Sequence, residues 1–480
     1  MASNKIKNSF FSKFQDLSIF DAGLFNLLLP AQIGYAKSYE FDYSFSKKPP
    51  WEFIPFAHYK RIISKLKCLS KKPDFDLSQL ANRPYFFYMP HKFLCSNGKY
   101  IPIYHHKFIE QFGRENSILC LMFYPNEIDI DYDFKRPEMC WDEAQAQPFD
   151  KDDTDLLRGI TKVIKKIRTH PKVTEREYRF MHVAMQMFWL DFRYWKYIIG
   201  KLNPKVGFVL GTYRHEDIIA AFKYWKIPIV ETQHVIKLPS DFYIAYPESV
   251  KSIRHKALFL DKVFVFGQYW KDQILKGHEY TDDQIENLGF YLHNKDEGVD
   301  IAEGLGINKN QNKIVCIVSQ PPARDELHKY IDWLADDITS KKLAAQIIIK
   351  LHPSDSVNCY DSLKKKHNCI HVVGYHSSIL DVFAASDVCV GIYSLSLYEA
   401  TMYNLPIYIL NVEKYKHYID DIIDSGVATL MKGFENPLLT DDLKTDYDSS
   451  YYYQEYNPTI IKELCEKIVM GREQQETVHH

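Results

Sequence analysis

The sequence alternates short, almost continuously apolar runs with longer stretches in which apolar residues recur at helical spacing. The apolar runs occupy residues 84–89, 117–124, 206–211, 228–232 and 262–266, and then 313–319, 346–351, 370–373, 388–391 and 407–409. A strand without polar alternation is buried on both faces, which is typical of a parallel sheet covered by helices on both sides. The pattern therefore predicts two doubly wound α/β domains in series.

The segments between these runs predict the helices that cover the sheets. They are residues 105–112, 154–169, 173–202, 215–225, 327–338, 378–385 and 397–403. Four glycines gather in the polar segment 287–312, which indicates a connection between domains. We expect a first Rossmann-like domain at 1–290, enlarged by helical insertions and an N-terminal extension. A second Rossmann-like domain is expected at 291–480, facing the first across a cleft.

Composition excludes several classes of protein. The 480 residues include 60 Lys and Arg against 62 Asp and Glu, so no global positive field exists to hold nucleic acid. Nine cysteines without a C-x-x-C pair argue against a disulfide scaffold or a zinc ribbon. Only 19 glycines argue against a glycine-rich phosphate loop. Neither a secretory signal nor an apolar membrane span is evident, so we expect a cytoplasmic protein.

Residues 47–72 depart from this near-neutral balance. The segment holds eight Lys or Arg and one Glu, interleaved with Trp51, Phe53, Phe56 and Tyr59. One use of such a segment is docking to an anionic membrane surface, here the cytoplasmic face of the inner membrane. The other is an amphipathic helix at 59–69 that packs on its domain with solvated lysines.

In the second half, polar residues follow the strand ends, the edge at which doubly wound sheets bind ligands. His352 and Pro353 end one strand, where an imidazole can donate to a phosphate oxygen and offset charge on a leaving nucleotide. Ser394, Ser396 and Glu399 follow another strand and open a helix, a position that favours phosphate and ribose hydroxyls. The same residues also fit ordinary turn and helix-capping roles.

Three further residues complete the predicted donor site. Ser319 and Gln320 follow the first strand of the second domain, where a nucleotide phosphate or a transferred sugar would pass, although the adjacent prolines also fit a bent turn. Tyr375 follows the strand at 370–373 and is expected near the nucleotide base.

The first domain carries its own polar groups behind two predicted strands. Tyr213, His215 and His234 are candidates for acceptor binding. Glu216 or Asp217 could take the proton from an acceptor hydroxyl, which makes them candidate catalytic residues with His352. Carboxylates in a first helical turn also complement the helix dipole without any catalytic role.

The stretch from the His-Pro pair through residue 410 resembles the donor-binding domain of GT-B glycosyltransferases. Residues 220–247 resemble the "ELQHG"-type stretch of bacterial surface-polysaccharide transferases, with Thr232 in place of Leu and Val235 in place of Gly. A His-Pro pair followed by a serine motif is similar to bacterial sialyltransferases, polysialyltransferases and Kdo transferases. In those families the His and the hydroxyls hold the phosphate of a CMP-sugar, which implicates the His-Pro and serine residues named above.

The resemblance implies transfer of a sugar from CMP-sialic acid, a related nonulosonate or CMP-Kdo to a glycan or lipid-linked acceptor, in capsule or lipopolysaccharide synthesis. We expect no cofactor and no required metal. A UDP-sugar or CDP-alditol donor remains an alternative. A sugar-nucleotide epimerase, which needs no acceptor, is an alternative of a different class.

Two acidic motifs stay outside this interpretation. Asp296, Glu297 and Gly298 match the acidic catalytic motif of those sialyltransferases, but they lie in the predicted connection rather than at a strand end. Asp129, Asp131 and Asp133 have the spacing of a cation site. They lie far in sequence from the nucleotide motifs, so we expect an exposed acidic loop.

Overall fold

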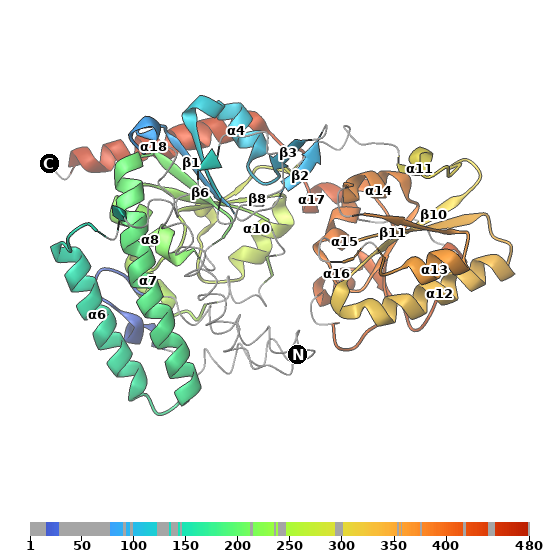
Figure 1. Ribbon diagram of the computed structural model, residues 1–480, viewed down its shortest axis with the longest axis horizontal. Coiled ribbons are helices and arrows are strands. Elements are labelled where there is room, and N and C mark those ends of the chain that lie inside the picture. The colour runs from blue at the N-terminus through green and yellow to red at the C-terminus, as the bar shows by residue number, and fades with distance from the viewer. Residues whose placement is uncertain are drawn as a thin grey trace. The chain divides into compact units, whose positions relative to one another are not determined.

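A computed structural model describes most of the chain. The described residues are 16–27, 77–89, 93–96, 99–121, 134–135, 143–144, 146–211, 215–234, 237–238, 246–292, 301–352, 355–356, 358–374, 377–415, 419–439 and 447–478. They form two compact units (Figure 1). The first domain takes in the chain up to Phe93, Lys99–Leu292 and Tyr456–His480, and the second takes in Leu94–Gly98 and His293–Glu455.

The first domain is built on a parallel sheet of seven strands in the order β5-β4-β1-β6-β7-β8-β9. The strands are β1 (Tyr85–Met89), β4 (Ser117–Leu121), β5 (Phe134–Lys135), β6 (Val206–Val209), β7 (Ile229–Thr232), β8 (Lys262–Val265) and β9 (Ile285–Asn287). A separate two-stranded sheet pairs β2 (Phe93–Ser96) with β3 (Lys99–Pro102).

Helices cover both faces of this sheet. Neighbouring residues of a strand point to opposite faces, and the two central residues of β1 show what covers each. Phe86 packs edge-on against Trp195 and Phe222, whereas Phe87 contacts Phe112. The helices α7 and α8 therefore cover one face and α4 the other. These three helices are α4 (His106–Phe112), α7 (Glu175–Leu202) and α8 (Glu216–Tyr224). The domain also contains α6 (Lys151–Arg168), α10 (Gln268–Leu275) and α18 (Pro458–Val478).

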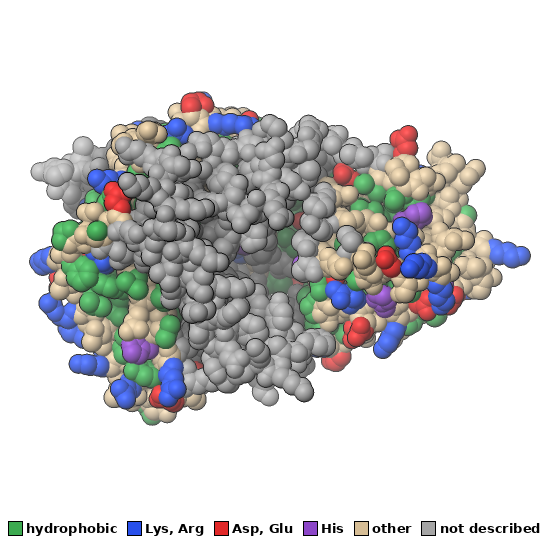
Figure 2. Space-filling model, viewed as in Figure 1, with side chains coloured by type: hydrophobic (Ala, Val, Ile, Leu, Met, Phe, Trp, Pro, Cys, Tyr) green, Lys and Arg blue, Asp and Glu red, His purple; other side chains and the backbone are tan. Residues whose placement is uncertain are grey.

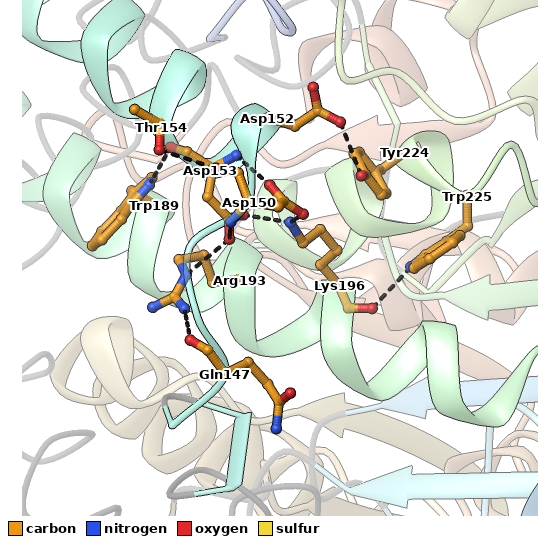
Figure 3. A network of polar contacts seen from close by, with 10 residues as sticks. All are labelled: Gln147, Asp150, Asp152, Asp153, Thr154, Trp189, Arg193, Lys196, Tyr224 and Trp225. Carbon is orange, nitrogen blue, oxygen red and sulfur yellow. Dashed lines mark hydrogen bonds and ion pairs between the residues drawn. The ribbon is translucent and has the colours of Figure 1, made fainter.

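The α6–α7 pair is the predicted helical insertion, and its helices begin at strong local signals. Asp150 and Asp153 form a capping box at the start of α6, and Thr174 and Glu177 form another at the start of α7. Figure 3 shows how α7 fixes the first turn of α6. The buried guanidinium of Arg193 lies 3.3 Å from the carboxylate of Asp153.

The second domain has a parallel six-stranded sheet in the order β12-β11-β10-β13-β14-β15. Its strands are β10 (Lys313–Val318), β11 (Ala345–Lys350), β12 (Ile370–Val373), β13 (Val388–Gly391), β14 (Ile407–Ile409) and β15 (Ala428–Leu430). Its helices are α11 (Ile301–Gly304), α12 (Arg324–Ser340), α13 (Asp361–Lys366), α14 (Ile379–Ala385), α15 (Leu395–Glu399), α16 (Asp420–Asp424) and α17 (Ser449–Tyr452). The central strands β10 and β11 are mostly apolar and buried, as expected of a doubly wound sheet.

These sheets confirm the predicted fold of two Rossmann-like α/β domains with helical insertions in the first. The C-terminal segment differs from the prediction, which assigned residues 291–480 to the second domain. From Tyr456 onward the chain belongs with the first domain. The Tyr456 ring lies 6.2 Å from that of Phe108, and Asn457 N–H donates to the carbonyl of Leu288 at 3.2 Å. A local pattern does not reveal such a return across the sequence.

The surface agrees with the near-neutral composition. On the face shown in Figure 2, basic and acidic side chains are interspersed over the described part of the second domain. Among the described helices, none combines the length and the apolar character that crossing a bilayer requires.

Candidate functional site

The second domain has a topological switch point between β10 and β13. From β10 the chain continues to β11 on one side of the sheet, whereas β13 lies on the other side. The loops that leave these two strands therefore diverge at their carboxyl ends, the position at which doubly wound sheets bind ligands. Gln320 links the loops, because its Oε1 accepts a hydrogen bond from the backbone N–H of Tyr393 at 2.9 Å. Two predicted donor segments thus meet at this switch point.

An arginine that the sequence analysis did not single out lies at the same edge. Arg324 begins α12, directly after the β10 loop, and its Nη2 is paired with Asp355. The Asp355 side chain has no exposed area, whereas that of Arg324 is 36% exposed. Asp355 also accepts a hydrogen bond from Ser319 Oγ, which lies 3.2 Å from the hydroxyl of Tyr360. A buried carboxylate thereby fixes a solvent-accessible guanidinium.

The Arg324 guanidinium is only partly engaged by Asp355. Its Nε is buried and donates to no acceptor in the described part of the chain, while the side chain as a whole is 36% exposed. Pairing with Asp355 raises the pKa of Arg324, so it carries its positive charge throughout the accessible pH range. A fixed guanidinium with free N–H groups at a strand's carboxyl edge is suited to phosphate oxygens.

His352 lies on the turn that carries Asp355. Its carbonyl accepts from the Asp355 N–H at 2.9 Å, and its side chain is exposed at the end of β11. The structure therefore places the predicted imidazole close in the chain to the residue that holds Arg324. Ser319, by contrast, is buried, and its hydroxyl is engaged by Asp355 and Tyr360.

Ser394, Ser396 and Glu399 come together behind β13, as predicted. Ser394 is the N-cap of α15, and its Oγ accepts from the Ser396 N–H at 3.2 Å. Glu399 is buried near Lys350, whose Nζ donates to the carbonyl of Leu351 at 3.1 Å. Burial raises the pKa of Glu399 to about 7, although the hydrogen bond from Ser396 and the charge of Lys350 act to lower it. Burial likewise lowers the pKa of Lys350 to about 8.

The shifted pKa of Glu399 predicts a pH dependence of stability. Below pH 4.5 both the folded and the unfolded states carry a neutral Glu399, and between pH 4.5 and about 7 only the unfolded state ionises. The free energy of unfolding should therefore fall across this interval, by an amount on the order of 3 kcal/mol. Glu399→Gln removes this contribution. We expect the Tm of the variant, relative to the parent protein, to rise between pH 5 and pH 8, and an unchanged difference would contradict the assignment.

In the first domain, Glu231 and His234 meet at the end of β6. Gly211 follows this strand with a φ of +109°, a conformation that favours glycine. A Cβ at Gly211 would lie 3.4 Å from Glu231 Oε1 and 3.6 Å from His234 Cε1. The His234 ring also contacts that of Tyr104, edge to face at 5.7 Å.

Glu231 is fully buried and forms an ion pair with Lys237, which is also buried. The next residue of β7, Thr232, hydrogen-bonds to Nε2 of His105 at 3.0 Å. Burial lowers the pKa of His105 to about 3, so its imidazole is neutral. Buried tyrosines surround the ion pair, and burial together with the charge of Glu231 raises the pKa of Tyr280 well above its usual value.

His215, Glu216 and Asp217 occupy the start of α8, directly behind β6. All three are buried, and the His215 ring lies edge-on to Tyr88 at 5.3 Å. Burial raises the pKa of the Tyr246 phenol well above its usual value, and the charges of Glu279 and Glu216 add smaller contributions. Glu216 therefore lies near Tyr246. The predicted base candidates and His234 therefore share the carboxyl edge of the first sheet, together with a buried ion pair.

Several predicted features lie outside the described residues. These are Tyr213, Pro353 and Tyr375, the basic segment 47–72, and the acidic motifs at 129–133 and 296–298. The sequence analysis missed Arg324, Asp355 and Lys237. Arg324 and Asp355 are 31 residues apart, and Lys237 lies beyond the end of the strand that carries Glu231, so only the folded chain reveals the pairings.

The described part of the chain contains one group of three potential metal ligands, Asp332, Asp336 and His367. Lys366 lies 2.7 Å from Asp332, and His367 Nε2 lies at the same distance from that carboxylate. These two groups already satisfy Asp332, and the three residues lie on α12 and after α13 rather than at the strand ends.

Residues 287–459 match the family model described as CDP-glycerol:poly(glycerophosphate) glycerophosphotransferase, which covers less than half of the chain. A search of curated proteins found no match.

Solved structures with a related fold include UDP-GlcNAc 2-epimerases. The enzyme from Methanocaldococcus jannaschii has 11% identity and a TM-score of 0.46, with 80% of this chain and 99% of that chain covered. The enzyme from Neisseria meningitidis, bound to UDP-GlcNAc, has 14% identity and a TM-score of 0.45, with 80% and 100% covered.

Proposed function

We propose that the protein is a transferase that moves an alditol phosphate group from a CDP-linked donor to a hydroxyl of its acceptor. The observation that carries the proposal is the glycerophosphotransferase match over residues 287–459, which spans the domain with the topological switch point. A CDP-alditol donor was one of the alternatives left open by the sequence. The CMP-sialic acid or CMP-Kdo donor that the sequence analysis favoured has no such support.

The proposed donor accounts for the cationic groups at the carboxyl edge of the second domain's sheet. In the reaction, an acceptor hydroxyl oxygen forms a bond to the phosphorus that bears the alditol. The bond from this phosphorus to the bridging oxygen breaks, and CMP leaves with that oxygen. Negative charge then accumulates on the CMP phosphate. Arg324 and His352 are suited to stabilise it, because charge-assisted hydrogen bonds to phosphate strengthen as charge develops.

The hydroxyl must lose a proton, and the first domain offers groups to receive it. We assign this role to the set formed by Glu216, Asp217 and His234, with His215 binding the acceptor beside them. Neutral imidazole or carboxylate at this edge can act as a general base. The acceptor is proposed to be a glycan, a lipid-linked saccharide or a polymer of alditol phosphate, reached by peripheral contact with the membrane. No metal is assigned to the reaction.

Nucleotide binding gives the first test. CDP and CMP are expected to raise the Tm of the full chain, whereas UDP and GDP are not. A ligand present at 100 times its Kd stabilises the folded state by about 2.7 kcal/mol, so binding is detectable as a rise in Tm. CDP-glycerol incubated with an oligomeric glycerol phosphate acceptor should release CMP, with EDTA present. His352→Gln should lower this release at least tenfold, and Lys329→Gln, an exposed position on α12, should leave it unchanged.

Three results would contradict the proposal. One is stabilisation by UDP but not by CDP. Another is conversion of UDP-GlcNAc in the absence of an acceptor, which would identify an epimerase. The third is turnover of CMP-sialic acid with none of CDP-glycerol, which would restore the donor favoured by the sequence.

A further inference from the structure

A pocket in the first domain lies at the opposite edge of the sheet from His215, Glu231 and His234. Its walls include Trp225 and Lys226, which precede β7, and His255 and Lys256, which precede β8. The cavity volume is about 530 Å³. Strands of four residues span roughly 13 Å, so this pocket is separate from the groups at the carboxyl edge.

Trp225 gives the pocket a fixed aromatic wall. Its side chain is 42% exposed, yet its Nε1 donates to the carbonyl of Lys196 at 2.8 Å (Figure 3). It also lies against Gly200, where an added Cβ would come within 2.6 Å of the indole Cζ2. An indole held on α7 in this way loses little side-chain entropy when a ligand stacks on it. Exposed, rigid tryptophans are typical anchors of binding sites.

The polar lining is rich in hydrogen-bond donors. The lining includes four basic side chains, Lys223, Lys226, His255 and Lys256, and one carboxylate, Asp152. Asp152 accepts a hydrogen bond from the Tyr224 hydroxyl at 3.0 Å (Figure 3).

Acidic residues behind the lining neutralise only part of this set. Asp261 pairs with Lys223 and Asp21 pairs with Lys256, each at 3.2 Å. Within the part of the chain that the structure describes, the side chains of Lys226 and His255 have no hydrogen-bond or ion-pair partner. A ligand with many acceptor oxygens would satisfy these donors.

The backbone at Lys226 favours glycine, which makes Lys226→Gly a suitable variant for testing the side chain. Lys226 ends the turn after α8 with a φ of +54°, the left-handed conformation in which glycine is the usual residue. Glycine would fit here with less strain, so the fold itself does not call for a lysine.

We propose that this pocket binds a phosphate-bearing polyol, a segment of the acceptor polymer held away from the site of transfer. A sugar or alditol chain lies along the indole of Trp225, and its phosphate contacts Lys226 and His255 as point charges. The identity of the occupant rests on the proposed function, whereas the pocket and its donors do not.

The test is a titration of the full chain with a synthetic glycerol phosphate hexamer, without nucleotide, followed by calorimetry. Trp225→Ala and Lys226→Gly should each weaken hexamer binding at least tenfold and leave CDP affinity unchanged. Lys226→Gly should keep the parent Tm or exceed it, so weaker binding cannot reflect misfolding. Lys162→Gln, an exposed lysine on α6 outside the pocket, should bind as the parent protein does.

Other outcomes overturn the proposal. Equal hexamer affinity in the parent protein and both pocket variants would show that binding occurs elsewhere. Equal affinity for maltohexaose would remove the requirement for phosphate. Binding to phosphatidylglycerol vesicles that depends on Trp225 and Lys226, without hexamer binding, would assign the pocket to a lipid surface. Failure of CDP to bind would contradict the proposed function, whereas the result of the hexamer titration would still test the pocket.

Discussion

Lys237→Met is expected to destabilise the first domain by about 3–5 kcal/mol, because it leaves a fully buried carboxylate without its ion-pair partner. Glu231 has no exposed area, and the Lys237 side chain is 4% exposed. Urea denaturation, followed by a probe of the first domain, measures the loss.

The double variant Glu231→Gln/Lys237→Met separates the charge from the packing. Removing both charges eliminates the unpaired buried ion, so most of the lost stability should return, with a coupling of at least about 2 kcal/mol in the double-mutant cycle. Lys201→Met, at an exposed position on α7, serves as the control for loss of a lysine. Additive effects of the two single variants would show that the pair does not act as a unit.

This ion pair also bears on the proposed base. Glu231 Oε1 and His234 Cε1 both approach Gly211, so the pair and the imidazole share one small space. A charge imbalance there would change the energy of protonating His234. If the double variant recovers stability but loses transfer activity, Glu231 and Lys237 position the reactive groups; recovery of both would limit their role to folding.

The fold was predictable from sequence because each central strand carries its signal locally. The runs at 313–319, 370–373 and 388–391 are almost continuously apolar, and the structure has strands at these places. Strands β9 and β15 were missed because three residues at a sheet edge carry too little apolar pattern. The docking of Tyr456 beside Phe108 was missed because only tertiary packing brings these rings together.

The candidate sites were predictable where the order of strands alone brings their residues to one edge of a sheet. Parallel strands place all their carboxyl ends at one edge, so Ser394 and Gln320 were expected near each other, and the bond from Tyr393 N–H to Gln320 joins their loops. Arg324 could not be found in this way. Its signal is a buried carboxylate, Asp355, that lies on a different loop and carries no motif.

Arg324→Gln is expected to weaken CDP binding by about 10- to 100-fold, the effect of losing a charge-assisted hydrogen bond worth about 1.5–3 kcal/mol. The same change leaves Asp355 buried and unpaired, so it also lowers stability. Asp355→Asn in the same chain removes the buried, unpaired charge and with it the loss of stability. The double variant Arg324→Gln/Asp355→Asn should regain much of the lost Tm while its CDP affinity stays low.

That divergence distinguishes a phosphate-binding arginine from a structural one. If Arg324 only stabilised the fold, recovery of Tm in the double variant would bring CDP affinity back with it. Lys329→Gln, on the same helix and exposed, controls for the loss of one positive charge from α12 and should bind CDP as the parent protein does. Because Asp355 fixes the guanidinium beside the β10 loop, Arg324→Lys should not restore affinity either: an ammonium cannot hold Asp355 and a phosphate in the same planar geometry. Parent-like CDP binding by the double variant would remove Arg324 from the proposed donor site.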